Sequence, residues 1–168
     1  MKTNLNFTLE NLYFNGVFLI KFKKFSDKRG FFFESFKKDY FFKKLKFDVV
    51  QENISLSKKD VIRGMHFQIP PYAQSKLISV LNGKIFDVFI DLRKDSKTYQ
   101  KWGGFQLDSE SNEQLFIPKG FAHGFLALSN NVKVSYKVDN YYNPSKERVI
   151  KWNDTTINIK WPISKPKL

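Results

Sequence analysis

Short apolar runs rich in Val, Ile, Phe and Tyr recur along the chain, separated by Gly, Asn, Pro and Asp. Such runs are typical of β-strands. One short helix is expected at residues 39–45, where Phe41, Phe42 and Leu45 lie close to a helical spacing. Many short strands with little helix favour an all-β fold, an antiparallel β-barrel or jelly roll with few short helices. The predicted strands are residues 17–22, 61–68, 76–81, 85–92, 102–107, 114–117, 124–128 and 132–138.

Two local signals refine this pattern. Asn82-Gly83 stands between two predicted strands and indicates a two-residue type I′ hairpin. Arg63 and His66 would face opposite sides of a regular strand, because alternate side chains point opposite ways. Gly64 between them indicates a β-bulge that resets the alternation.

The same alternation places polar side chains on apolar faces. Tyr136 shares its face with Val134 and Val138, so we expect it to point into the barrel, where its hydroxyl needs a partner. Lys76 lies at the end of an apolar face and either reaches solvent or enters a pocket. Gln51 and Asn53 begin a polar row on one face of an extended segment.

Length and composition limit the class of protein. With 168 residues, of which 42% are hydrophobic, residues 1–168 are expected to form one domain with a substantial core. No apolar run approaches the roughly 20 residues of a membrane helix, and the N-terminus lacks a signal-peptide pattern. The absence of cysteine excludes disulfides and agrees with a cytoplasmic location.

The formal net charge of +13 favours polyanionic partners. The lysines are scattered, and the arginines that read base edges best number only Arg29, Arg63, Arg93 and Arg148. A solvated, lysine-rich surface is therefore the preferred interpretation. We expect neither a nucleic-acid nor a membrane partner.

The chain has only two histidines, and each lies in a compact motif. His123 ends a Pro-x-Gly-x-x-His motif that begins at Pro118, a spacing similar to the second motif of the cupin barrels. The segment around His66 offers one histidine where a cupin metal site would need His-x-His. We therefore expect no metal, since too few nitrogen ligands are available. Acid–base chemistry is the better interpretation.

One site could hold a base, an acid and anion-binding groups. His66 has an ordinary pKa near neutrality and could act as a base. Tyr136 could donate a proton across from it, while Lys76, Arg63 and His123 stabilise charge that develops on a substrate oxygen. Such groups suit removal of a proton beside a carbonyl and its return from the other face. Taken singly, each residue could also be purely structural.

Together these motifs make the chain similar to the dTDP-4-dehydrorhamnose 3,5-epimerase family. The resemblance extends from about Phe25 to Pro162 and depends on the order of several modest motifs. These are residues 27–34, 51–53, 61–68, 83–88, 91–96, 117–125, 136–137, 140–142 and 152–154.

The resemblance implies a cofactor-free and metal-free cupin-type barrel that forms a homodimer by exchanging N-terminal strands. It implies epimerisation beside the C4 ketone of dTDP-4-dehydro-6-deoxy-D-glucose, on the route to dTDP-L-rhamnose for cell-surface polysaccharides. His66 would accept the proton, Tyr136 would donate one, and Lys76 would stabilise the enolate. Tyr142 or Tyr141 would stack on the thymine. The other residues that would line the substrate site are Arg29, Glu34, Gln51, Asn53, Arg63, His123 and Glu147, with Arg29 and Glu34 coming from the partner subunit.

The sequence departs from the family pattern near its end. Family members usually have a Ser-x-x-Asp segment after the Trp-Pro element, and its aspartate pairs with the catalytic histidine. Here no acidic residue follows Asp154, so Asp87 is the expected substitute beside His66. The alternatives are a single-carbon epimerase, a ketoisomerase on another nucleotide sugar, and a non-catalytic cupin that binds a nucleotide sugar.

Overall fold

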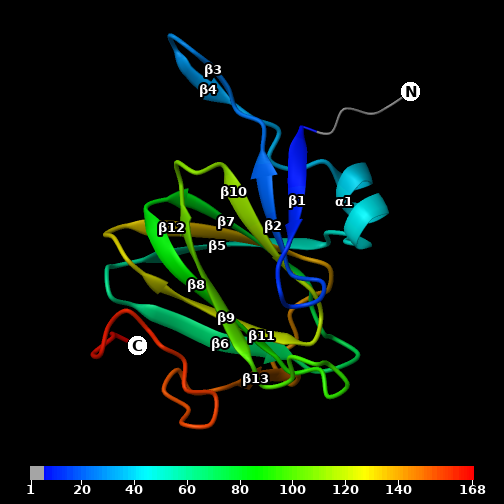
Figure 1. Cartoon of the computed structure of the whole chain (residues 1–168), viewed down its shortest axis with the longest axis vertical. Coiled ribbons are helices and arrows are strands. Elements are labelled where there is room, and N and C mark those ends of the chain that lie inside the picture. The colour runs from blue at the N-terminus through cyan, green and yellow to red at the C-terminus, as the bar shows by residue number, and fades with distance from the viewer. Residues whose placement is uncertain (1–5) are drawn as a thin grey trace.

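Two antiparallel β-sheets face each other in the computed structural model, which describes residues 6–168 (Figure 1). The predicted antiparallel all-β barrel is thereby confirmed. The first sheet has the order β1 (Phe7–Asn11), β2 (Phe18–Phe22), β10 (Glu113–Ile117), β7 (Lys76–Asn82), β12 (Val132–Val138) and β5 (Gln51–Ser57). The second has the order β13 (Glu147–Val149), β6 (Ile62–Gln68), β11 (Phe121–Ala127), β8 (Lys84–Asp91) and β9 (Trp102–Asp108).

The turn at Asn82-Gly83 corrects one prediction, because it does not form a hairpin. Strands β7 and β8 lie in different sheets, so the chain crosses from one sheet to the other at this point. Gly83 has a φ of 83°, but Asn82 is not among the residues with positive φ that a type I′ turn requires at both central positions. The glycine is used because a Cβ there would lie 2.4 Å from Ser129 Oγ.

Apolar side chains cover both faces of both sheets, which explains the near-continuous apolar runs in the sequence. The space between the sheets is filled from both sides, for example by Ile78 and Phe89. The outer face of the first sheet packs against α1 (Lys38–Leu45) through Phe41, which is 1% exposed. The outer face of the second sheet packs against the C-terminal segment around Ile159 and Trp161.

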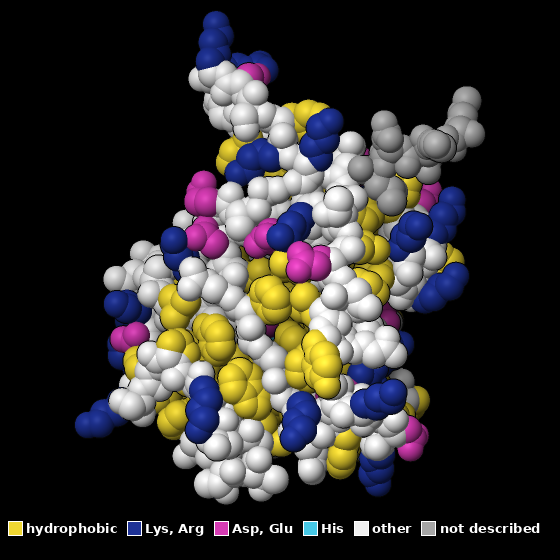
Figure 2. Space-filling model, viewed as in Figure 1, with side chains coloured by type: hydrophobic (Ala, Val, Ile, Leu, Met, Phe, Trp, Pro, Cys, Tyr) yellow, Lys and Arg dark blue, Asp and Glu magenta, His cyan; other side chains and the backbone are white. Residues whose placement is uncertain are grey.

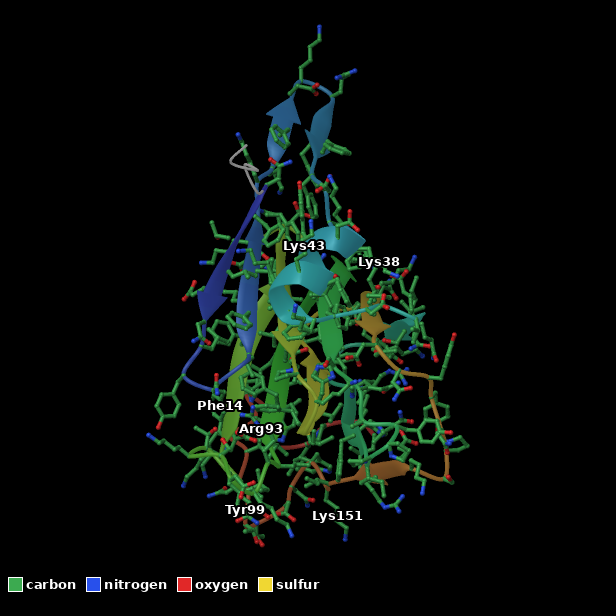
Figure 3. All side chains as sticks on the ribbon, turned by 90° about the vertical axis from the view of Figure 1, so that its right-hand side faces the viewer. Phe14, Lys38, Lys43, Arg93, Tyr99 and Lys151 are labelled. Carbon is green, nitrogen blue, oxygen red and sulfur yellow. The ribbon has the colours of Figure 1, made fainter. Side chains whose placement is uncertain are left out.

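A small hairpin projects from the body of the molecule. It consists of β3 (Phe25–Asp27) and β4 (Gly30–Phe32), which pair only with each other. Figures 1 and 3, drawn at right angles, both show it standing clear of the two sheets, with α1 and its Lys38 and Lys43 nearer the body. Dark blue basic side chains mark its tip in Figure 2, where Lys28 and Arg29 are exposed. This hairpin was not among the predicted strands, which leave residues 25–32 unassigned.

Within residues 6–168, no helix combines the length and the apolar character that crossing a membrane requires.

Candidate active site

A cavity of about 1000 Å³ opens between the two sheets and is lined by strands from both of them. Most of the residues expected to form a site lie on its wall. These are Gln51, Asn53, Arg63, His66, Lys76, His123, Tyr136, Tyr142 and Glu147. The cavity therefore brings together the expected base, the expected acid and the expected anion-binding groups.

The bulge predicted at Gly64 allows Arg63 and His66 to face the same cavity. On the neighbouring strand β11, His123 pairs with His66 and Phe125 pairs with Arg63, so two steps along β11 match three along β6. Gly64 has a φ of 123°, and a Cβ there would lie only 2.4 Å from the Cα of Gly124. Close approach of the two strands therefore requires glycine at this position.

One edge of the His66 ring faces the protein. Its Nδ1 is shielded from solvent and has no hydrogen-bond partner of regular geometry in the part of the chain described. The Oε1 of Glu147 lies 3.0 Å away, at ion-pair distance but out of line with the ring N–H. Strand β13 supplies this carboxylate, because Val149 pairs with His66 and Glu147 lies two residues away on the same face.

The surroundings of His66 favour its neutral form. Burial lowers the pKa of His66 below its ordinary value, and the nearby charges of Lys76 and His123 lower it further. The Glu147 carboxylate acts in the opposite direction. Because the side chain is 45% exposed while Nδ1 is shielded, Nε2 is the nitrogen available to a ligand in the cavity. A neutral imidazole with an open Nε2 can accept a proton.

The expected pairing of Asp87 with His66 is wrong. Asp87 pairs with His123 instead. It is fully buried, and its two oxygens lie 2.9 and 3.1 Å from His123 Nε2. The reason is the strand order, because β11 lies between β6 and β8 and separates Asp87 from His66. The Asp87 carboxylate therefore fixes the His123 ring from the side away from the cavity, and His123 remains part of the cavity lining.

Lys76 enters the pocket and does not reach solvent; only 9% of its surface is exposed. Its ammonium Nζ donates a hydrogen bond of 3.2 Å to the backbone oxygen of His66, so it spans the space between the sheets. Burial lowers the pKa of Lys76 to about 8, although Asp87 and Glu147 partly oppose this shift. A cation thus lies inside the cavity next to the candidate base.

Tyr136 is on the wall opposite His66. It belongs to β12 of the first sheet, where it pairs with Asn53 on one side and Ile78 on the other, whereas His66 belongs to the second sheet. As the alternation of side chains predicted, Tyr136 packs against the core between the sheets together with Val134.

Polar contacts organise the loop at the edge of the cavity. The backbone N–H of Tyr142 donates to Gln51 Oε1 at 3.1 Å, and the Tyr142 hydroxyl donates to Glu147 Oε2 at 2.9 Å. Tyr142 lines the cavity, whereas Tyr141 is 62% exposed and does not. Of the two tyrosines, Tyr142 is therefore placed to contact a ligand.

Arg29 and Glu34 do not reach the cavity of their own chain. Arg29 lies on the projecting hairpin, where its side chain is 84% exposed and pairs with Asp27. Glu34 follows the hairpin and does not line the cavity.

Sequence reasoning missed Gln68 and the segment that includes Trp152. Gln68 is buried and fixes the Tyr142 loop, donating to the backbone oxygen of Tyr141 and accepting from the N–H of Asn143. Trp152 lines the cavity from the C-terminal segment. The sequence did contain a signal for Gln68: it lies two residues after His66, so its side chain is on the same face of the strand as the candidate base.

Comparisons with known proteins identify the family. The chain matches the family described as dTDP-4-dehydrorhamnose 3,5-epimerase over residues 11–168. The protein of that name from Shigella flexneri is 47% identical over 154 residues, which cover 90% of this chain and 85% of the relative.

Solved structures agree in fold as well as in sequence. The dTDP-4-dehydrorhamnose 3,5-epimerase of Bacillus anthracis, solved with TDP and PPi bound, has a TM-score of 0.91 and 42% identity over 95% of this chain and 93% of that one. The Legionella pneumophila dTDP-6-deoxy-D-glucose-3,5-epimerase, solved with dTDP-4-keto-L-rhamnose, has a TM-score of 0.90 and 40% identity over 95% of this chain and 86% of that one. This chain therefore belongs to the dTDP-4-dehydrorhamnose 3,5-epimerase family.

Proposed function

We propose that this chain epimerises dTDP-4-dehydro-6-deoxy-D-glucose at the two carbons beside its C4 ketone, in the biosynthesis of dTDP-L-rhamnose. Family membership supports the reaction. The single observation that carries the mechanism is the placement of His66 and Tyr136 on opposite walls of one cavity, with the buried Lys76 reaching across it.

The first step is proton removal. The Nε2 of neutral His66 takes the proton from a carbon beside the ketone, and the electron pair of that C–H bond forms the enolate, whose charge lies on the former ketone oxygen. The buried Lys76 ammonium stabilises this charge. With a pKa of about 8, roughly nine in ten Lys76 side chains are charged at pH 7.

The second step returns a proton to the same carbon from the other face. Tyr136 donates its hydroxyl proton, and water then restores the phenol while His66 releases its proton to solvent. Because removal and return take place on opposite faces, the configuration of the carbon inverts. Repetition at the second flanking carbon completes the double epimerisation.

The edge of the cavity suits the nucleotide part of the substrate. The Tyr142 ring is 53% exposed there and can stack on the thymine. The Arg63 guanidinium is oriented by Ser57 Oγ at 2.8 Å and by the backbone oxygen of Leu56 at 3.1 Å, and it remains exposed for a diphosphate oxygen.

The active form in this proposal is a homodimer that exchanges its N-terminal strands. The projecting hairpin carries exposed apolar side chains, Phe31 at 51% and Phe32 at 68%. The edge strand β5 exposes Ile54 at 65% and Leu56 at 57%. Apolar surface of this kind is characteristic of an interface between proteins. In the dimer, Arg29 and Glu34 would reach the cavity of the partner.

Incubation with the 4-keto substrate in D₂O tests the reaction. The wild-type protein should introduce deuterium at both C3 and C5, as measured by NMR, and His66→Ala should introduce none. Deuterium at one carbon would support the single-carbon epimerase instead. Tight binding of dTDP-sugar with no exchange would support the non-catalytic cupin, and full exchange by His66→Ala would remove His66 from the role of base.

A further inference from the structure

The buried Nδ1 of His66 needs a partner. An unsatisfied buried polar atom costs about 1–3 kcal/mol, so such atoms are almost always paired in folded proteins. Among residues 6–168, Glu147 is the only carboxylate within ion-pair distance of this ring, at 3.0 Å from Nδ1. The two atoms are at hydrogen-bond distance, and the bond forms when the imidazole and the carboxylate turn into line with each other.

Glu147 is itself held in place. Backbone hydrogen bonds fix the chain on both sides of it, from the Ile69 N–H to the oxygen of Lys146 at 3.0 Å and from the Ile150 N–H to the oxygen of Met65 at 3.0 Å. Its second oxygen, Oε2, accepts the Tyr142 hydroxyl proton at 2.9 Å. The Tyr142 hydroxyl therefore holds one carboxylate oxygen, and the other lies next to the candidate base.

We propose that Glu147 is the positioning residue of the base: its Oε1 accepts the Nδ1–H of His66, which leaves Nε2 free to take the substrate proton, while the Tyr142 hydroxyl holds Oε2. This inference rests on the proposed function, because it assigns the partner of the base in that reaction. A carboxylate that fixes the tautomer of a histidine in this way is a common device of acid–base sites.

The arrangement also links nucleotide binding to proton transfer. The ring of Tyr142 lies at the edge of the cavity, where the nucleotide is expected to bind, and its hydroxyl holds the carboxylate that orients His66. A base stacked on this ring would restrict its movement and thereby order Glu147. Substrates that lack the nucleotide should therefore lose turnover as well as affinity.

The charges facing His66 determine the pH effect of removing Glu147. Glu147 on β13 raises the pKa of His66, whereas burial, Lys76 on β7 and His123 on β11 lower it. Asp87 on β8 lies behind His123 and binds it. Without the Glu147 charge the pKa of His66 should fall, so the acid limb of the pH profile should move to lower pH.

Glu147→Gln tests this role because it keeps the shape of the side chain and removes its charge. We expect kcat to fall about 10- to 100-fold, KM to stay within about threefold, and the acid limb of kcat/KM to move to lower pH. Tyr142→Phe keeps the aromatic ring, so it should lower kcat by less and leave KM nearly unchanged. The matched control is Glu110→Gln, which alters an exposed carboxylate in the turn between β9 and β10 and should change neither parameter.

A second measurement does not depend on turnover. With only two histidines in the chain, ¹⁵N NMR of histidine-labelled protein can be assigned with one His66→Asn variant. The proposal predicts that neutral His66 carries its proton on Nδ1. A proton on Nε2, or an unmoved acid limb in Glu147→Gln, would overturn it. If the wild-type protein exchanged no deuterium, the proposed function would fail, yet the NMR result would still decide whether Glu147 orients His66.

Discussion

Replacing Asp87 with Asn removes the negative charge behind the candidate active-site cavity while nearly preserving the shape of the side chain. Asp87 is fully buried and binds His123, and its charge raises the pKa of Lys76, which is also buried. Asparagine can still form a hydrogen bond with His123 but cannot support the Lys76 cation. The variant should therefore affect Lys76, the group proposed to stabilise the enolate, without altering the proposed base or acid.

The size of the effect follows from the pKa of Lys76, which is about 8. An opposite charge close by shifts a pKa by about 1–3 units, and we take a decrease of about one unit in the pKa of Lys76 as the effect of losing the Asp87 charge. At pH 8, a one-unit decrease reduces the charged fraction of Lys76 from about a half to about a tenth. Activity at that pH should fall about fivefold from this cause alone, whereas at pH 6 it should change much less.

The assay is the pH profile of kcat/KM, in which the alkaline limb of the wild-type enzyme should lie near pH 8 and that of Asp87→Asn at lower pH. Asp91→Asn is the matched control, because Asp91 is a buried aspartate on the same strand that pairs with Arg93. This control should lower stability, measured by thermal unfolding, and should not change the pH at which the alkaline limb of kcat/KM lies. An alkaline limb that does not move in folded Asp87→Asn would refute the role assigned to the Lys76 charge.

Two further predictions concern stability and assembly. Because the pKa of Lys76 is lowered from 10.5 to about 8, the unfolded chain binds this proton more tightly, so stability should rise between pH 8 and 10.5, by up to about 3 kcal/mol. Urea unfolding should show this rise relative to Lys76→Met, and equal pH dependence in the two proteins would contradict it. Phe32→Ser should weaken the proposed dimer about 10- to 100-fold in analytical ultracentrifugation, since burying a Phe stabilises by about 1.5–3 kcal/mol. A monomeric wild-type protein would exclude the exchanged dimer.

Features that depend on alternation within one strand could be predicted from the sequence. The inward direction of Tyr136 and the bulge at Gly64 follow from which neighbours share a face, and the structure agrees with both. For Lys76 the alternation left two possibilities, solvent or a pocket, and the structure shows it buried in the pocket. These features needed no knowledge of which strands lie side by side.

Features that depend on strand order could not be predicted in this way. The partner of Asp87 is set by the position of β11 between β6 and β8, and nothing in the local sequence gives that order. Glu147 lies in a strand of three residues that follows a run rich in Asn, Pro, Ser and Lys, too short for a periodic signal. Only its pairing with β6 in the structure identifies residues 147–149 as a strand, and the same pairing brings Glu147 next to His66.

The central claim, proton transfer from opposite walls of one cavity, is tested most directly by Tyr136→Phe with substrate in D₂O. His66 remains able to remove and return a proton on its own face, so this variant should introduce deuterium while the configuration of the sugar carbons is retained. The wild-type enzyme should introduce deuterium and invert them. Inverted, labelled product from Tyr136→Phe at the wild-type rate would contradict the account.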